Sequence, residues 1–230
     1  MTSGLTREFA LSAGLMVTGA VSNAVATFAL LPPTKGADHE AVLTRYADSG
    51  AWVAGHLVQF AGILLGLAGL FVLARALRPE APHLAALAGA GAVATAATWA
   101  VAQAMDGVAL KQALDAWVDA PPADEATRLG NAETVLWTGW GVRSLSYAVY
   151  GVTLVLLGVA VAVSRRFGAG IGSVAVAAGS LSLVIGIDVA YRGSETEFYA
   201  LSSVAYQLLV VVFVVGLVIA EVRPRAHRPT

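Results

Sequence analysis

Apolar residues run through this chain in long stretches instead of alternating with polar ones. Six stretches of about 20 or more predominantly apolar residues follow one another: 9–31, 51–74, 84–105, 134–163, 167–187 and 198–220. About 20 apolar residues in a helix suffice to cross a bilayer, and these stretches are polar on no consistent side. The sequence therefore predicts an all-α fold, a polytopic integral membrane protein built as a six-transmembrane-helix bundle.

The first stretch has an alternative interpretation as a cleaved signal peptide. Arg7 precedes it, and Ala24, Val25 and Ala26 form the small-residue pattern that a signal peptidase favours. The apolar run continues to Leu31, however, which is long for a signal and suits a membrane anchor. We expect this helix to be retained.

Composition excludes several classes of protein. Only 13% of the 230 residues are charged and 57% are hydrophobic, whereas a soluble domain carries roughly 25% charged residues. A net charge of −1 gives no sign of a nucleic-acid partner. The absence of cysteine excludes disulfides, thiolate metal sites and cysteine nucleophiles. The expected partner is the lipid bilayer, and residues 1–230 are expected to form one transmembrane domain with a basic tail at 221–230.

The distribution of Lys and Arg predicts an orientation, because positively charged flanks stay in the cytoplasm. One side of the predicted bundle holds Arg7, Arg75, Arg78, Arg165, Arg166, Arg223, Arg225 and Arg228. The other side holds Lys35, Arg45, Lys111, Arg128 and Arg192. We therefore expect a multi-pass protein of the cell membrane with both termini in the cytoplasm.

The connections on the less basic side are predicted to be structured. Residues 38–46 have the pattern of a short helix with acidic residues in its first turn. The apolar spacing of residues 108–118 continues the third helix until Pro121 and Pro122 stop it, and Asp124 is placed to cap the helix leading into the fourth span. Short amphipathic helices are thus expected in the outer loops.

Ionisable side chains inside a bilayer are costly and are candidates for function. Counting about 20 residues outward from the proposed cytoplasmic ends brings His56, Asp106, Arg143 and Asp188 to one outer level. Adding residues on the same helical faces gives the full set of predicted ligand-binding residues: His56, Gln59, Gln103, Asp106, Glu133, Trp137, Trp140, Arg143, Tyr147 and Asp188. If these faces converge, they form a polar pocket rimmed by aromatic rings and open to the outside.

Each candidate also has a structural interpretation. The tryptophans fit an aromatic belt at the membrane surface, and the two aspartates fit helix ends in the headgroup zone. Arg143 could pair with Glu133, Asp106 or Asp188, and His56 could hydrogen-bond to a neighbouring helix. The pairs Gly62 with Gly66 and Gly168 with Gly172 are expected to let helices approach closely.

No known catalytic or cofactor motif is present. The remaining histidines, His39, His83 and His227, fall in loops or the tail, so no metal site is predicted and no cofactor is expected. The catalytic residues, if the protein is an enzyme, are unknown, with His56, Asp106 and Asp188 as candidates.

Three functions remain open. The favoured one is binding or transport of a small lipophilic molecule or ion at the polar layer. The second is an intramembrane enzyme acting on an isoprenoid or lipid, with Asp106 or Asp188 as general acid and His56 as base. The third is a structural or accessory subunit whose polar layer locks the helices together. The sequence does not indicate an oligomeric state.

Overall fold

The computed structural model describes residues 2–32, 39–164 and 166–222, and helix is the only regular secondary structure in this part of the chain. Six helical segments are long and apolar enough to cross a membrane, which confirms the predicted six-helix bundle. They are α1 (Thr2–Val25) with the π-helix η1 (Ala26–Leu30); α3 (Trp52–Leu77); α4 (Pro82–Gln103) with the π-helix η2 (Ala104–Ala109) and α5 (Leu110–Val118); α6 (Glu125–Val163); α7 (Ala169–Arg192); and α8 (Glu197–Val222).

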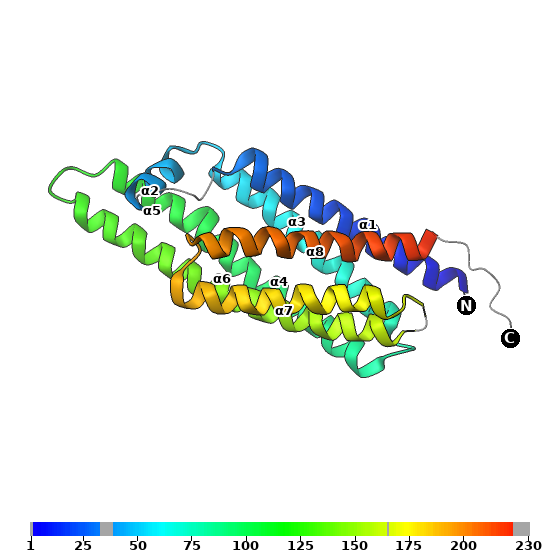
Figure 1. The fold of residues 1–230 in the computed structure, drawn as a ribbon. Helices are drawn as coiled ribbons and strands as arrows, with labels where there is room; N and C mark the ends of the chain where they lie inside the picture. Colours follow the sequence, from blue (N-terminus) through cyan, green and yellow to red (C-terminus); the bar gives the residue numbers. More distant parts are fainter. Residues whose placement is uncertain (1, 33–38, 165, 223–230) are drawn as a thin grey trace.

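The six helices form a closed ring in the contact order α1, α3, α4, α6, α7, α8 and back to α1. The start of α1 and the end of α8 lie at one end of the bundle, which we call the terminal end (Figure 1). The short helix α2 (His39–Asp48), helix α5 and the first part of α6 lie at the opposite end, called the loop end (Figure 1). The predicted basic tail, residues 221–230, falls almost wholly outside the described residues.

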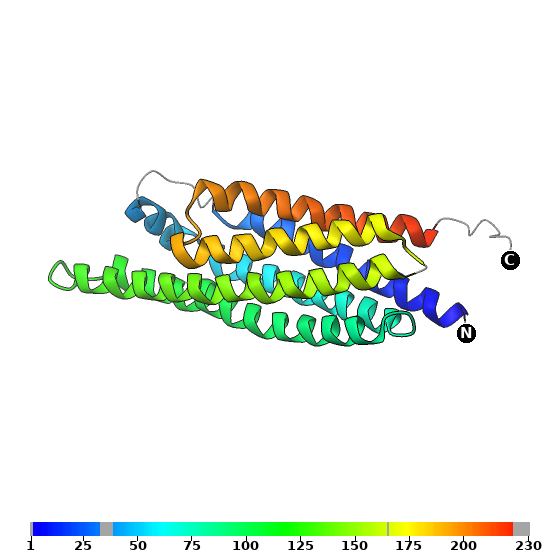
Figure 2. The same cartoon turned by 60° about the horizontal axis from the view of Figure 1, so that its bottom comes forward.

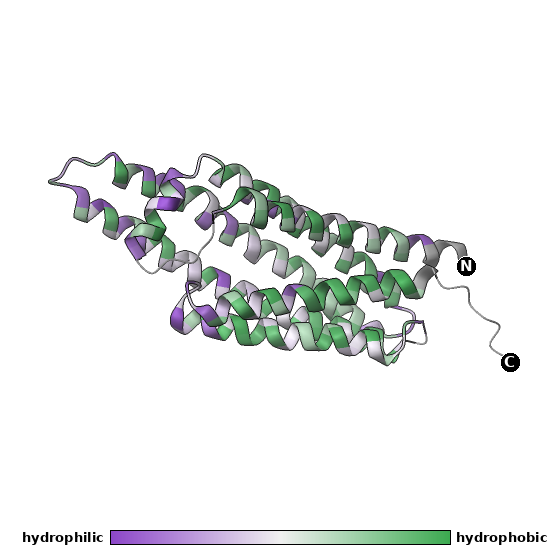
Figure 3. Cartoon of the chain, turned by 45° about the horizontal axis from the view of Figure 1, so that its top comes forward, coloured by the Kyte–Doolittle hydropathy of each residue, from purple (hydrophilic) through white to green (hydrophobic). Residues whose placement is uncertain are grey.

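Apolar side chains cover the outside of the ring, where a soluble protein would place polar ones. Phe28, Leu201 and Leu208 are 73%, 63% and 61% exposed, and Figure 3 shows hydrophobic residues along the bundle with hydrophilic ones concentrated at the loop end. Exposed apolar surface on this scale requires a lipid environment. The inside holds a hydrophobic core to which all six helices contribute, including Phe9 of α1 and Phe213 of α8.

Helices α5 and α6 extend beyond the rest of the bundle at the loop end (Figure 2). Helix α6 has 39 residues, about 58 Å at the rise of an α-helix, whereas the hydrocarbon core is about 30 Å thick. Helix α2 packs against α5. We call α2, α5 and residues 125–140 of α6 the cap. The cap and Trp52 share a separate hydrophobic cluster: Val42, Leu43, Tyr46, Trp52, Leu110, Leu114, Trp117, Ala132 and Leu136.

The predicted outer helices are therefore present, with differences at their ends. Helix α2 is described from His39, and Asp38 lies outside the described residues. Asp124 stands at the N-cap of α6, as predicted, but its side chain makes no capping hydrogen bond. Helix α7 begins at Ala169 instead of residue 167, because Gly168 has a φ of +81°, a left-handed conformation that a right-handed helix does not contain.

Helices α6 and α7 pack backbone against backbone through glycines spaced seven residues apart. Gly158 lies against Gly172 and Gly151 against Gly179. A Cβ atom at Gly158 would lie 2.8 Å from both the Gly172 carbonyl oxygen and the Val176 nitrogen, so no side chain fits. Small residues at this spacing allow the close approach that stabilises helix pairs in lipid.

The two predicted glycine pairs differ in outcome. Gly62 of α3 packs on Gly19 of α1 as expected, and the Gly66 backbone also lies against Gly19, but a Cβ at Gly66 would meet no atom within 4 Å. Gly172 packs against α6, but its predicted companion Gly168 lies in open space before the helix. The α6–α7 interface uses the seven-residue glycine spacing instead of the four-residue one.

Gly158→Leu tests the close packing of α6 on α7. Because the new side chain would overlap the α7 backbone, we expect a loss of about 1–3 kcal/mol, the usual cost of overpacking. The measurement is the thermal unfolding midpoint of the purified protein in detergent. Gly141→Ala on the same helix is the control, because a Cβ there meets no atom within 4 Å. Equal midpoints for both variants would contradict the packing argument.

Candidate functional site

The centre of the loop-end half of the ring is an ion pair between Asp106 of η2 and Arg143 of α6. Asp106 is buried and the Arg143 side chain is only 18% exposed. Arg143 Nη1 also donates to Ser194 Oγ at 3.3 Å, in the α7–α8 connection. Gly139 makes room for the pair, because a Cβ there would lie 2.9 Å from Asp106 Oδ1. Three acidic partners were predicted as possible for Arg143, and the one that pairs with it is Asp106.

Trp52 and His56 of α3 lie against the other side of η2. Trp52 Nε1 donates to the Asp106 carbonyl oxygen at 2.7 Å. His56 Nδ1 lies 2.9 Å from the Trp52 carbonyl oxygen, and because a carbonyl only accepts, Nδ1 carries a proton. The His56 side chain packs on Gly107, where a Cβ would clash with it. His56 is thus bound within its own helix, close to the backbone of η2.

Two glutamines extend the polar contacts toward α1. Gln103 Nε2 donates to Gln59 Oε1 at 2.8 Å, and Gln59 Nε2 donates to Thr27 Oγ1 at 3.2 Å. The chain of amides connects α4, α3 and η1. The buried Gln103 Oε1 accepts no hydrogen bond in the part of the chain that the structure describes.

An aromatic cluster closes the opposite side of the ring. The Tyr147 and Tyr199 hydroxyl oxygens are 3.3 Å apart. The Tyr147 ring centroid lies 5.3 Å from that of Trp99 and 6.2 Å from that of Tyr206, both edge-to-face. These rings connect α4, α6 and α8.

Asp188 organises the connection between α7 and α8. Its carboxylate forms an ion pair with Arg192, one turn further along α7, and accepts from the Thr196 hydroxyl at 3.2 Å. Thr196 Oγ1 in turn accepts from the Tyr199 backbone N–H at 3.0 Å, near the start of α8. Asp188 therefore reaches Arg143 only indirectly, through the connection that carries both Thr196 and Ser194.

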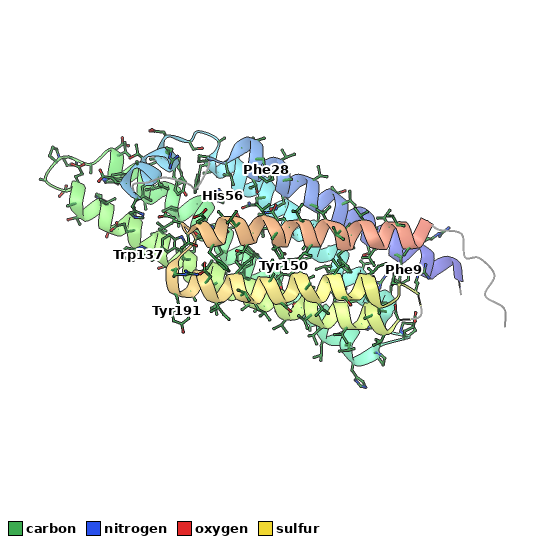
Figure 4. All side chains as sticks on the ribbon, in the orientation of Figure 1. Phe9, Phe28, His56, Trp137, Tyr150 and Tyr191 are labelled. Carbon is green, nitrogen blue, oxygen red and sulfur yellow. The ribbon has the colours of Figure 1, made fainter. Side chains whose placement is uncertain are left out.

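The predicted site residues thus divide into two groups. One group makes polar contacts in the loop-end half of the ring, and we call it the polar layer: His56, Gln59, Gln103, Asp106, Arg143, Tyr147 and Asp188. The other three residues lie outside it. Trp137 is 53% exposed on the outside of the bundle, as Tyr191 is at 87% (Figure 4), while Trp140 packs on Gly193 and Glu133 belongs to the cap.

An open groove lies beside the polar layer, where no binding residue was predicted. It occupies about 340 Å³ between the end of η1 and the end of α2. Its lining residues are Ala29, Leu30, Leu31, Pro32, Arg45, Asp48 and Ser49. Leu31 packs on Gly55, the neighbour of His56. The groove therefore has one apolar wall from η1 and one polar wall from α2, and it adjoins the polar layer.

Tyr46 lies next to the groove residue Arg45 and inside the cap core. Burial raises its pKa to about 12, and the nearby Glu195 carboxylate adds to this rise. Its ring centroid lies 4.5 Å from that of Trp52. Tyr46 therefore stays neutral at physiological pH and acts as an apolar anchor for α2.

Comparison of the chain with protein-family models, curated proteins and solved structures gives no match. Among the described residues, no group of three His, Asp or Glu side chains is arranged to hold a metal ion. The interpretation of the site therefore rests on its own geometry.

The Asp106–Arg143 pair can be tested by single and double substitution. Asp106→Asn or Arg143→Met alone leaves a buried charge without its partner, and we expect each to cost about 3–5 kcal/mol. The double variant removes both charges and should lose less than the two single losses combined. The measurement is the thermal unfolding in detergent of the wild-type protein, the two single variants and the double variant, which together form a double-mutant cycle. Additive losses would show that the two side chains do not interact.

Proposed function

We propose that this protein binds a small amphipathic molecule at the outer face of the cell membrane, in the groove between η1 and α2. The observation that carries the proposal is the open groove of about 340 Å³, one wall of which is apolar and the other polar. Its apolar wall suits a hydrocarbon portion. Arg45, Asp48 and Ser49 suit a polar head that lies at the membrane surface.

The polar layer supports this role by holding the helices in position, and its side chains take part in no chemical reaction. Asp106 and Asp188 are each engaged by an arginine, and His56 donates to a backbone carbonyl. A general acid and a general base need access to the reacting atoms. This arrangement gives the enzyme hypothesis less support than the binding hypothesis. In this proposal the layer fixes the ends of the helices beside the groove, which is the role that a structural subunit would also give it.

The proposed orientation places the termini in the cytoplasm and the cap outside. Its support is the sequence count of Lys and Arg, with eight on the side predicted to hold the termini and five on the other side. The groove then opens toward the outer leaflet.

Cysteine labelling tests this orientation, because the chain has no cysteine of its own. Ala126→Cys lies in the exposed first turns of α6, and His83→Cys lies in the exposed turn at the start of α4. A membrane-impermeant maleimide should label the first variant in intact cells and the second only after permeabilisation. The reverse pattern would place the cap in the cytoplasm.

A bulky side chain in the groove tests ligand binding. We expect native mass spectrometry of the wild-type protein to show a co-purified small molecule, and Ala29→Trp to lose it because the indole fills the groove. Ala41→Trp is the matched control, since Ala41 is exposed on α2 but does not line the groove. The proposal fails if the wild-type protein carries no bound molecule, or if both variants retain it equally.

A further inference from the structure

His39, the first residue of α2, lies between two carboxylates that are distant in the sequence. Its Nε2 is 3.3 Å from Glu133 Oε1 of α6, and its Nδ1 is 3.1 Å from Glu195 Oε2 of the α7–α8 connection. All three side chains are partly buried. A single imidazole therefore joins three segments of the loop end.

The protonation state of the ring decides whether both contacts are hydrogen bonds. A neutral imidazole has one N–H and one lone pair, and a carboxylate only accepts. A neutral His39 would thus donate to one glutamate and turn a lone pair toward the other. An imidazolium donates to both, so with two ionised glutamates both contacts are hydrogen bonds only when the ring is protonated.

The other charged groups around α2 are already engaged or lie further along the helix. Lys111 of α5 pairs with Asp115 and donates to the Ala47 carbonyl oxygen at 2.9 Å, near the far end of α2. Arg143 of α6 is paired with Asp106. On α2 itself, Glu40 follows His39, and Arg45 stands near Tyr46. The Glu133 and Glu195 carboxylates are the groups within ion-pair distance of the His39 ring.

We propose that His39 is a proton-operated latch for the cap. When His39 is protonated, its ring bridges Glu133 and Glu195 and holds the start of α2 on α6 and on the α7–α8 connection. When it loses the proton, one bridge is lost and the start of α2 loosens. Because α2 carries one wall of the groove, the latch regulates access to the groove, although the latch itself does not depend on any ligand.

Spin labels can measure this movement in the full chain, which has no native cysteine. Ala41→Cys on α2 and Ala126→Cys on α6 are both exposed. Pulsed electron resonance of the doubly labelled protein in lipid nanodiscs gives the distribution of distances between the two helices. We expect a narrow distribution in acid, at about pH 5.5, and a broader one in mild alkali, at about pH 8.5.

Substitutions at the latch separate the proposal from a general effect of pH. His39→Gln cannot gain a proton, so its distribution should not respond to pH. His39→Arg stays charged with several N–H donors and should remain narrow at both pH values. His83→Gln, at the exposed start of α4, should keep the wild-type response. Glu195→Gln removes one arm of the bridge and should also reduce the response.

The latch is disproved by either of two results. One is a wild-type distance distribution that is the same at both pH values. The other is a pH response that persists in His39→Gln, which would assign the titration to a different group, or one that is undiminished in Glu195→Gln. If His39→Gln does not fold, the wild-type comparison and Glu195→Gln still decide the question.

Discussion

The loop-end half of this bundle depends on one buried ion pair, Asp106 with Arg143. A charge inside or at the edge of a membrane is tolerated only when it is paired and hydrogen-bonded. Here the pairing brings together η2, α6 and, through Ser194, the α7–α8 connection. Trp52 fixes the same turn from α3 by donating to the Asp106 carbonyl oxygen. The positions of the groove and the cap depend on these contacts. Helix α2 packs against Trp52, α5 follows directly after η2, and the cap part of α6 continues into Arg143.

Below the polar layer close packing of helix backbones adds to polar contacts such as the Arg75–Glu8 ion pair and the hydrogen bond from Ser12 to the Gly69 carbonyl oxygen. Lipid chains are as apolar as leucine, so burial gives little drive for one helix to pack on another, and close van der Waals contact takes its place. The glycines of α6 and α7 and the contact of Gly19 with Gly62 provide that contact. The bundle thus combines polar contacts with close backbone packing along its length.

The six membrane-spanning helices could be predicted from the sequence, because the length and hydropathy of a segment decide whether it can span a membrane. It also singled out Asp106 and Arg143, which form an ion pair, but it left three partners open for Arg143. The choice depends on η2, where a π-turn holds one more residue than an α-turn and rotates the face that follows. The groove was missed because residues 29–32 and 45–49 meet only once the cap core has oriented α2. The sequence contains Gly172, Gly179 and Gly186 at a spacing of seven residues, whereas the predicted packing pairs were glycines four residues apart.

The ring has a seam where α1 meets α8, the first and the last of its helices. Each of the other five contacts joins helices that are consecutive spans and can form as a hairpin while the chain is being inserted. The seam cannot form until α8 has entered the membrane. Until then the inner edges of α1 and α7 face lipid, and the core residues Phe9 and Met16 lack the α8 side chains they pack with. Closure of the interior therefore depends on a contact between distant parts of the chain.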